Sequence, residues 1–171
     1  VILNIGSIYL KNRDYRKAAE KYQQTISLFE KIGDKNAKFY GLNTANSNLG
    51  LIEERKGNYK KAEEIYYQIY QRRLEKDKKE DILYSLSQLI SVKLLQGDEL
   101  TAQNKYKEAE RVYQKADEKQ DNSLFIRNWG YVQLVYGAYN QSVKKYDLAL
   151  TYLFKAKEIL KAFPSLSLIH I

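Results

Sequence analysis

The chain has no cysteine and no methionine, and only one proline and one histidine among its 171 residues. Without cysteine it forms neither disulfide bonds nor a cysteine-ligated zinc site, and thiolate catalysis is excluded as well. No apolar run reaches the roughly 18 residues of a membrane-spanning helix, so we expect no membrane segment within this chain. Because the sequence begins at Val1 inside a helical pattern, we expect it to be a fragment of a longer protein.

Residues suited to catalysis are scarce. The single histidine, His170, stands in an apolar tail and has no thiol nucleophile to activate. The acidic pairs Glu53-Glu54 and Glu63-Glu64 are neighbours in sequence, so on a helix they point about 100° apart rather than facing each other across a substrate. We therefore expect no enzyme activity, no catalytic residue, no metal site and no cofactor.

The formal net charge is +8 and the sequence pI is about 9.4, which invites a nucleic-acid interpretation. Basic and acidic residues are nevertheless interleaved, as in residues 71–81 (QRRLEKDKKED) and 105–111 (KYKEAER). That pattern is typical of a solvated helix face with pairs at i, i+4. We therefore do not expect a nucleic-acid partner, and a basic-surface nucleic-acid-binding module stays as the alternative function.

One stretch of the chain contains a pattern that recurs. In residues 46–70 (NSNLGLIEERKGNYKKAEEIYYQIY), Gly50 is followed by Tyr59, Ala62 and Tyr66. The same frame recurs at Gly6, Tyr15, Ala18 and Tyr22, at Gly97, Tyr106, Ala109 and Tyr113, and at Gly137, Tyr146, Ala149 and Leu153. Successive glycines are 44, 47 and 40 residues apart, which is a period typical of helical solenoids.

Apolar residues at helical spacing predict that each repeat is a pair of antiparallel helices. The expected repeats are residues 1–33, 36–78, 81–119 and 122–163. Asp14 is placed to accept hydrogen bonds from the first turn of a helix that begins at Tyr15. Small residues such as Gly50 and Ala62 would let the paired helices approach closely at that crossing, while tyrosines fill the space beside it.

Two repeats admit more than one register. In the third, the turn between the helices falls either at Gly97-Asp98 or at residues 103–105. We prefer the second position because it keeps the nine-residue spacing from glycine to tyrosine. In the fourth, Trp129-Gly130 competes with Tyr136-Gly137, and the same spacing favours Gly137.

The repeat frame resembles the tetratricopeptide repeat family. The matching residues include Leu49-Gly50, Gly57-Asn58-Tyr59, Ala62 and Tyr66, and earlier in the chain Ile5-Gly6, Tyr9, Asp14-Tyr15, Ala18 and Tyr22. The resemblance implies an all-α, right-handed superhelical solenoid of about four antiparallel helix hairpins, whose concave groove binds a peptide or protein segment. The repeats are longer than the family's usual length of about 34 residues and are similar to a long-helix type found in bacterial regulators. We therefore expect the sensor or interaction part of a longer bacterial signalling or regulatory protein, located in the cytoplasm.

In this family the first helix of each repeat lines the groove. The resemblance therefore implies ligand-binding positions at Thr44, Ser47, Asn48, Leu51, Arg55, Ser91, Leu94, Tyr131 and Leu134. Asn, Ser and Thr are mediocre helix formers, so the run at residues 43–48 (NTANSN) is either a hydrogen-bonding lining for a peptide or merely a hydrophilic face. We expect Arg55 to pair with Glu53 or Glu54 rather than with a ligand carboxylate.

The end of the chain differs from the rest. We expect a last helix over residues 146–162 with Pro164 as its stop. Residues 166–171 (LSLIHI) belong to no helical period and match one reading frame of a transposon-end adapter. We interpret residues 164–171 as a tail that is not native, the alternative being an apolar extension that docks on the last hairpin.

Overall fold

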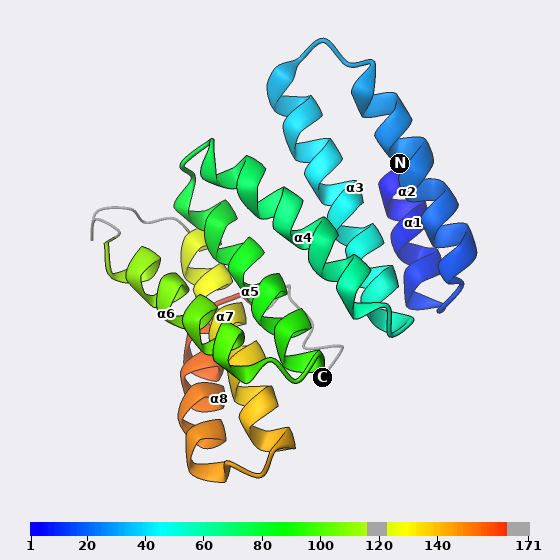
Figure 1. The fold of residues 1–171 in the computed structure, drawn as a ribbon. Helices are drawn as coiled ribbons and strands as arrows, with labels where there is room; N and C mark the ends of the chain where they lie inside the picture. Colours follow the sequence, from blue (N-terminus) through cyan, green and yellow to red (C-terminus); the bar gives the residue numbers. More distant parts are fainter. Residues whose placement is uncertain (116–122, 164–171) are drawn as a thin grey trace. The chain divides into compact units, whose positions relative to one another are not determined.

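The structure is a computed structural model, which describes residues 1–115 and 123–163. These residues form eight helices and contain no strand, which confirms the all-α prediction (Figure 1). The helices are α1 (Ile2–Lys11), α2 (Tyr15–Glu30), α3 (Lys35–Arg55), α4 (Tyr59–Leu74), α5 (Lys79–Leu95), α6 (Glu99–Gln114), α7 (Ser123–Ser142) and α8 (Tyr146–Leu160).

Aspartates begin three of these helices. The Asp14 carboxylate accepts a hydrogen bond from the Lys17 backbone N–H at 3.1 Å, which confirms the cap predicted for α2. Asp34 accepts from two backbone N–H groups at the start of α3, and Asp98 accepts from one at the start of α6. Because the first turn of a helix has unpaired N–H groups, these side chains fix where each helix starts.

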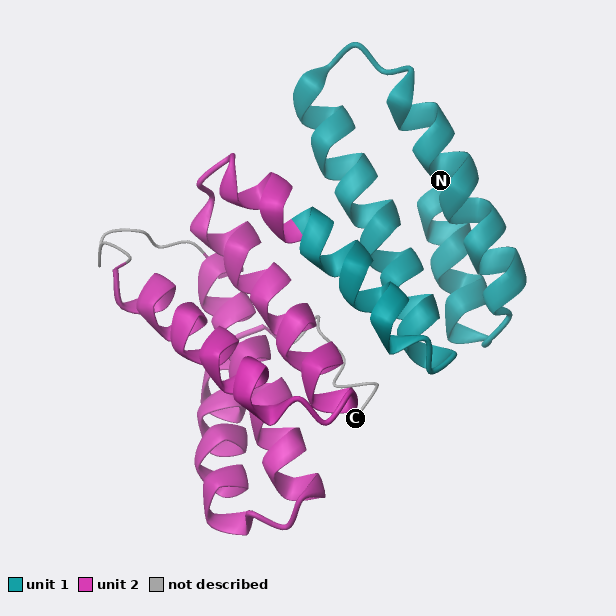
Figure 2. Cartoon of the chain, in the orientation of Figure 1, with its two compact units in different colours: residues 1–69 teal, residues 70–171 magenta. Residues whose placement is uncertain are grey.

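The described chain divides into two compact units, residues 1–69 and 70–171 (Figure 2). The boundary falls inside α4, so unit 1 contains α1, α2, α3 and the first part of α4. Unit 2 contains the end of α4 and the helices from α5 to α8.

In unit 1, α2 packs between α1 and α3. The core is formed by residues with no solvent exposure, Ala18 and Tyr22 of α2 and Ala45 and Ile52 of α3. Burial of these side chains is the main favourable term that holds the three helices together.

Glycines of the first helices make room for rings of the second helices. A Cβ atom on Gly6 would lie 2.7 Å from the Tyr22 ring, and one on Gly50 would lie 2.5 Å from the Tyr66 ring. The crossing predicted between Gly50 and Ala62 is therefore wrong in one respect. Ala62 is fully buried, but the atoms closest to Gly50 belong to Tyr66, because the glycine admits the ring rather than a second small residue.

In unit 2, α5 packs against α6 and α7, and α7 packs against α8. Leu83, Leu86 and Ile90 of α5 and Val132 of α7 have no solvent exposure and form the centre of this packing. The pairs α5/α6 and α7/α8 are the two hairpins of unit 2, and α7 links them.

The register preferred for the third repeat is wrong. The turn lies at Gly97-Asp98 and not at residues 103–105, since α5 ends at Leu95 and α6 begins at Glu99. Gly97 has a φ of +76°, and no atom lies within 4 Å of the point that a Cβ would occupy, so it serves the turn and not a helix crossing. Ile90, twelve residues before Ala102, takes the position that Gly50 holds twelve residues before Ala62.

The register preferred for the fourth repeat is confirmed. Gly137 lies within α7, where an added Cβ would be 2.9 Å from the Leu153 side chain of α8. The last helix ends at Leu160, two residues before the predicted end. The interpretations of Pro164 and of residues 164–171 fall outside the described residues.

Candidate binding surfaces

Four of the residues predicted to bind a ligand lie on one side of α3. Thr44, Asn48, Leu51 and Arg55 are spaced at four, three and four residues, so they share one side of the helix. Thr44 and Arg55 are exposed, whereas Asn48 and Leu51 are half-buried. In unit 1 these four residues form one accessible stripe, which we call the α3 row.

The polar side chains of this helix donate to their own backbone. The Thr44 hydroxyl donates to the Tyr40 carbonyl at 2.8 Å, and the Asn48 amide donates to the Thr44 carbonyl at 3.1 Å. These bonds explain how such residues are accommodated inside a helix. The Asn48 side-chain oxygen accepts no hydrogen bond within the described part of the chain, so it is available to a partner's N–H group.

Two other polar residues of the same run, Ser47 and Asn43, are buried. Ser47 is only 6% exposed and adds little surface to the α3 row. Asn43 is 2% exposed, and neither of its side-chain polar atoms has a hydrogen-bond partner in the described residues. An unpaired buried amide costs about 1–3 kcal/mol, so Asn43 is a local weakness in the packing of α3.

The glutamates expected to pair with Arg55 are engaged elsewhere. Glu53 accepts a hydrogen bond from the Asn58 amide at 2.9 Å and forms ion pairs with Lys56 and Lys61. Glu54 accepts a hydrogen bond from the Tyr66 hydroxyl at 3.3 Å. The Arg55 guanidinium forms no ion pair or hydrogen bond with described residues, so the expected pairing is wrong as a direct contact, although the Arg55 charge acts to lower the pKa of Glu54.

In unit 2 the corrected register changes which residues correspond to the α3 row. Counted from Ala102 instead of Ala109, the equivalents of Thr44, Asn48, Leu51 and Arg55 on α5 are Tyr84, Gln88, Ser91 and Leu95. Ser91 stays in the row and is half-buried. Leu94, predicted from the wrong register, is 9% exposed and lies outside the row. The sequence contained the information needed, because Gly97-Asp98 is a turn pattern in its own right.

The fourth repeat keeps its predicted positions. Tyr131 and Leu134 of α7 are both half-buried, and the register that selected them is the observed one. Tyr131 is the equivalent of Thr44, because it also stands eighteen residues before the alanine of its second helix, Ala149.

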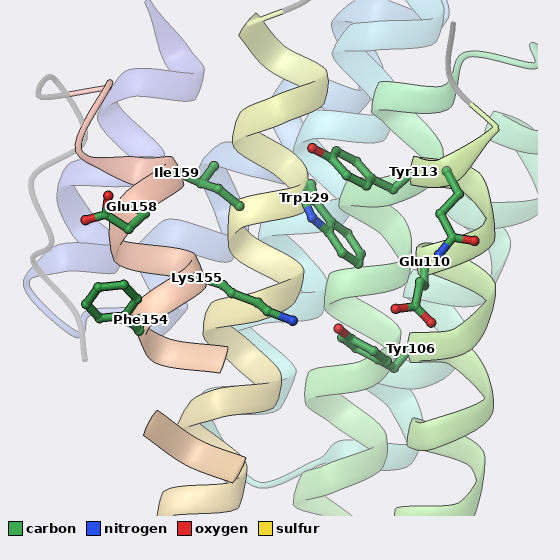
Figure 3. Close-up of a pocket in the computed structure, with 9 residues that line it drawn as sticks. Tyr106, Glu110, Tyr113, Trp129, Phe154, Lys155, Glu158 and Ile159 are labelled. Carbon is green, nitrogen blue, oxygen red and sulfur yellow. The ribbon is translucent and has the colours of Figure 1, made fainter. Parts of the chain in front are cut away.

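A pocket of about 530 Å³ lies among α6, α7 and α8, away from the predicted positions (Figure 3). It is lined by Tyr106, Glu110, Tyr113, Gln114, Trp129, Phe154, Lys155, Glu158 and Ile159. Its volume falls within the range of about 300–1,000 Å³ that is usual for small-molecule sites. No sequence pattern marks it, because the nine residues come from three helices that the chain brings together only when folded.

The inner wall of the pocket is a stack of aromatic rings. Tyr113 stacks on Trp129 with ring centroids 4.6 Å apart, and on Phe125 at 5.5 Å. Tyr106 stacks on Tyr136 at 4.5 Å and lies 6.0 Å from Trp129. Such arrangements add to the free energy gained by burial, so these rings contribute to the packing of unit 2.

A buried hydrogen bond holds Tyr106, one ring of this stack, in place. The Gln133 amide donates to the Tyr106 hydroxyl at 3.1 Å, and both side chains are buried. Burial raises the pKa of Tyr106 above its ordinary value, and the hydrogen bond with Gln133 opposes the rise only in part. The phenol is therefore neutral throughout the physiological pH range.

The described residues offer neither a metal site nor a membrane span. No group of three or more His, Cys, Asp or Glu residues in 1–115 and 123–163 is placed to hold a metal ion. No helix in the described part of the chain is both long enough and apolar enough to cross a bilayer.

Helix hairpins repeated along the chain define the class of helical repeat proteins, and three of the hairpins here have a glycine where their two helices meet. Two models of the tetratricopeptide repeat match the sequence, one over residues 3–77 and the other over residues 41–116. The chain therefore belongs to the tetratricopeptide repeat family, as the sequence patterns predicted. No curated protein matches the chain. Repeats of this family generally mediate protein–protein interaction and scaffolding, and they are typically not catalytic.

Proposed function

We propose that the chain is a protein-binding repeat scaffold that holds a peptide or protein segment on its first helices. The observation that carries this proposal is the α3 row, which combines the unpaired acceptor of Asn48 with the unpaired guanidinium of Arg55. An amide oxygen and a guanidinium recognise a peptide N–H and a carboxylate respectively. Leu51 lies between them and offers apolar contact.

Finer parts of the proposal rest on the sequence. We propose four repeats, at residues 1–33, 36–78, 81–119 and 122–163, within the sensor or interaction part of a longer bacterial signalling or regulatory protein. The long spacing between successive repeats supports this context. Location in the cytoplasm stays a prediction.

A selection from a phage-displayed library of random peptides tests the proposal. The bait is the whole chain, and the recovered peptides are compared with a triple variant that carries Thr44→Ala, Asn48→Ala and Arg55→Ala. Each lost polar contact removes about 1 kcal/mol of binding free energy, so we expect the affinity of recovered peptides to fall at least tenfold. Calorimetric titration of synthetic copies measures the fall.

A matched control uses the outer face of the neighbouring helix. Lys60 and Gln68 of α4 are exposed and lie outside the row, so the variant Lys60→Ala/Gln68→Ala should bind the same peptides with unchanged affinity. Peptides that bind the triple variant as tightly as the native chain would place the binding surface elsewhere. Failure to enrich any peptide would contradict the function itself.

The arrangement of ion pairs supports a protein partner over a nucleic acid. Exposed basic residues pair with acids along the chain, as in Arg16 with Glu20 at 3.3 Å and Lys145 with Glu99 at 3.2 Å. Such pairs break up the continuous positive surface that phosphate binding requires. Tight binding to a random DNA duplex that weakens steeply with salt would favour the nucleic-acid alternative instead.

A further inference from the structure

The pocket in unit 2 lies beside α6 and α8, which are the second helices of the third and fourth repeats. The corresponding positions one repeat earlier are in direct contact. Eight residues after the buried alanine, α4 has Tyr70, and six residues after its own alanine, α6 has Glu108. The Tyr70 hydroxyl donates to the Glu108 carboxylate, and the Lys105 ammonium lies 4.9 Å from the centre of the Tyr70 ring. These contacts join the end of α4 that belongs to unit 2 to α6.

At the next junction the same two positions carry opposite charges. The equivalent of Tyr70 is Glu110 on α6, and the equivalent of Glu108 is Lys155 on α8. Both line the pocket, and Figure 3 shows Lys155 extending from α8 toward the side occupied by α6. Neither forms an ion pair or a hydrogen bond within the described residues, although the Lys155 ammonium lies 5.7 Å from the centre of the Tyr152 ring. By sequence position the two residues correspond to Tyr70 and Glu108, which are in direct contact. Two charges of opposite sign, neither in an ion pair, therefore line one pocket.

The aromatic wall limits what the pocket can bind. Tyr113 stacks on Phe125 and on Trp129, and Tyr106 stacks on Tyr136 and lies tilted against Trp129. Because a cation is attracted to the open face of a ring and these rings face one another, the wall is unsuited to caging an ammonium group. The ring edges, together with Ile159, offer an apolar surface instead.

We infer that this pocket binds a small zwitterion with an apolar body, of the chemical class of an apolar dipeptide. Its ammonium group pairs with Glu110, its carboxylate pairs with Lys155, and its side chains lie against Trp129 and Ile159. This site is separate from the first-helix surface of the proposed function, and neither depends on the other.

The size of the pocket favours a dipeptide over a single amino acid, and the placement of the two charges on different helices is compatible with one. Glu110 and Lys155 come from different helices and stand more than 4.0 Å apart, since no ion pair joins them. A free amino acid carries both charged groups on one carbon, whereas a dipeptide holds them a residue apart. The pocket volume of about 530 Å³ also accommodates two apolar side chains.

Fluorescence of the single tryptophan tests the inference directly. Trp129 lines the pocket and is the only tryptophan in the sequence, so its emission reports occupancy. The probe is leucyl-leucine, titrated into the whole chain at up to millimolar concentration. We expect a saturable change in emission, with the affinity confirmed by calorimetry.

Two ligand analogues and two variants of the chain test which charged group of the dipeptide pairs with Glu110 and which pairs with Lys155. N-acetyl-leucyl-leucine lacks the ammonium group, and leucyl-leucinamide lacks the carboxylate. Glu110→Gln should weaken leucyl-leucine and leucyl-leucinamide about three- to tenfold while leaving the acetylated analogue unaffected. Lys155→Gln should weaken leucyl-leucine and the acetylated analogue while leaving the amide unaffected.

Controls separate the pocket from general effects of charge. Lys107 and Lys157 are exposed residues of α6 and α8 that do not line the pocket, so Lys107→Gln and Lys157→Gln should bind the dipeptide as the native chain does. Circular dichroism melting of each variant shows that the fold is retained. A pocket variant that melts early is replaced by Glu110→Asp or Lys155→Arg, which keep the charge and should keep part of the binding.

Three results would overturn the inference. The first is no response to leucyl-leucine by fluorescence or calorimetry. The second is equal binding of the acetylated and amidated analogues to both charge variants. The third is binding only of a longer blocked peptide that carries lysine and glutamate beside two leucines, which would make the pocket a contact for a protein segment.

Discussion

At the scale of single residues, glycine and tyrosine form complementary pairs across a helix hairpin. Gly6 faces Tyr22, and Gly50 faces Tyr66, in both cases closely enough that no Cβ atom fits without movement. Tyr22 and Tyr66 are almost completely buried, so their rings have little room to move. The glycines of these two hairpins are thus required by packing rather than by backbone conformation.

Replacing one of these glycines should destabilise the fold. Gly50→Ala places a methyl group 2.5 Å from the Tyr66 ring. Overpacking costs about 1–3 kcal/mol, and the better helix propensity of alanine returns about 1 kcal/mol. We expect a net loss of about 1 kcal/mol, measured by urea denaturation.

The control for this substitution is Gly33→Ala. Nothing lies within 4 Å of the Cβ position of Gly33, and its φ is not in the left-handed region, so its stability should stay within about 0.5 kcal/mol of the native chain. Equal losses for the two variants would show that the Gly50 contact with Tyr66 is unimportant.

A second residue-scale prediction concerns the buried pair Tyr106 and Gln133. Tyr106→Phe leaves the Gln133 amide buried without this hydroxyl, and an unsatisfied buried group costs about 1–3 kcal/mol. The double variant Tyr106→Phe/Gln133→Leu removes both polar partners and should be more stable than Tyr106→Phe alone. Urea denaturation of the native chain, Tyr106→Phe, Gln133→Leu and the double variant measures this, and strictly additive losses would contradict it.

At the scale of helices, two adjacent glutamates at the end of α3 have opposite electrostatic roles. Burial raises the pKa of Glu54 above its ordinary value, against the smaller effects of the Tyr66 hydroxyl and the Arg55 charge. For Glu53, burial also acts to raise the pKa, but Asn58, Lys56 and Lys61 together outweigh it and hold the pKa below its ordinary value.

These shifts predict opposite pH dependences for the two matched variants. A raised pKa means that the contribution of Glu54 is fully present below its unfolded pKa of about 4.3 and is lost as pH rises through the folded pKa. A lowered pKa means that the contribution of Glu53 is present above that unfolded value and is lost as pH falls through the folded pKa. At pH 7, Glu54→Gln should therefore raise the melting temperature, because the amide still accepts from Tyr66, and Glu53→Gln should lower it.

The comparison is made by thermal melting at pH 7 and near pH 4. Both differences from the native chain should shrink at the lower pH, where the carboxyl groups become protonated. A stabilising effect of Glu53→Gln at pH 7 would show that its ion pairs with Lys56 and Lys61 do not favour the charged form.

Much of the helix arrangement could be predicted from sequence. Apolar periodicity and the capping aspartates locate the helices outside the third repeat to within a few residues, because both are local properties of the chain. The register of the third repeat failed because Ile90 stands where the other repeats have glycine, and Gly97 is a turn residue instead. Glycine serves two purposes in this chain, and spacing alone does not separate them.

At the scale of the whole molecule, we expect the two compact units to have separate unfolding transitions. In repeat proteins stability is a sum of local terms, so a change in one unit need not be felt in the other. Trp129 belongs to unit 2, whereas circular dichroism reports the helices of both units. Gly50→Ala in unit 1 should therefore shift the dichroism transition more than the Trp129 fluorescence transition. Identical shifts would indicate a single cooperative unit.

The candidate binding surfaces were predictable to different extents. Thr44, Asn48, Leu51 and Arg55 could be named in advance because the resemblance to the repeat family implied them, and helical spacing within one segment places them on one side of α3. The pocket depends on the folded arrangement of three helices and on two charges, Glu110 and Lys155, that look like ordinary surface residues in the sequence. Long-range packing of this kind has no periodic pattern to mark it.

The contrast between the sealed and the open junction suggests how such a chain diversifies. Tyrosine and glutamate clasp one pair of second helices, while glutamate and lysine at the same two places leave a vacancy beside the next pair. A change of side chain at these two positions, one of which is the buried Tyr70, would thus help to open or fill the space between two second helices. A repeat protein can in this way gain a binding site between one pair of successive repeats without changes to the contacts between the other repeats.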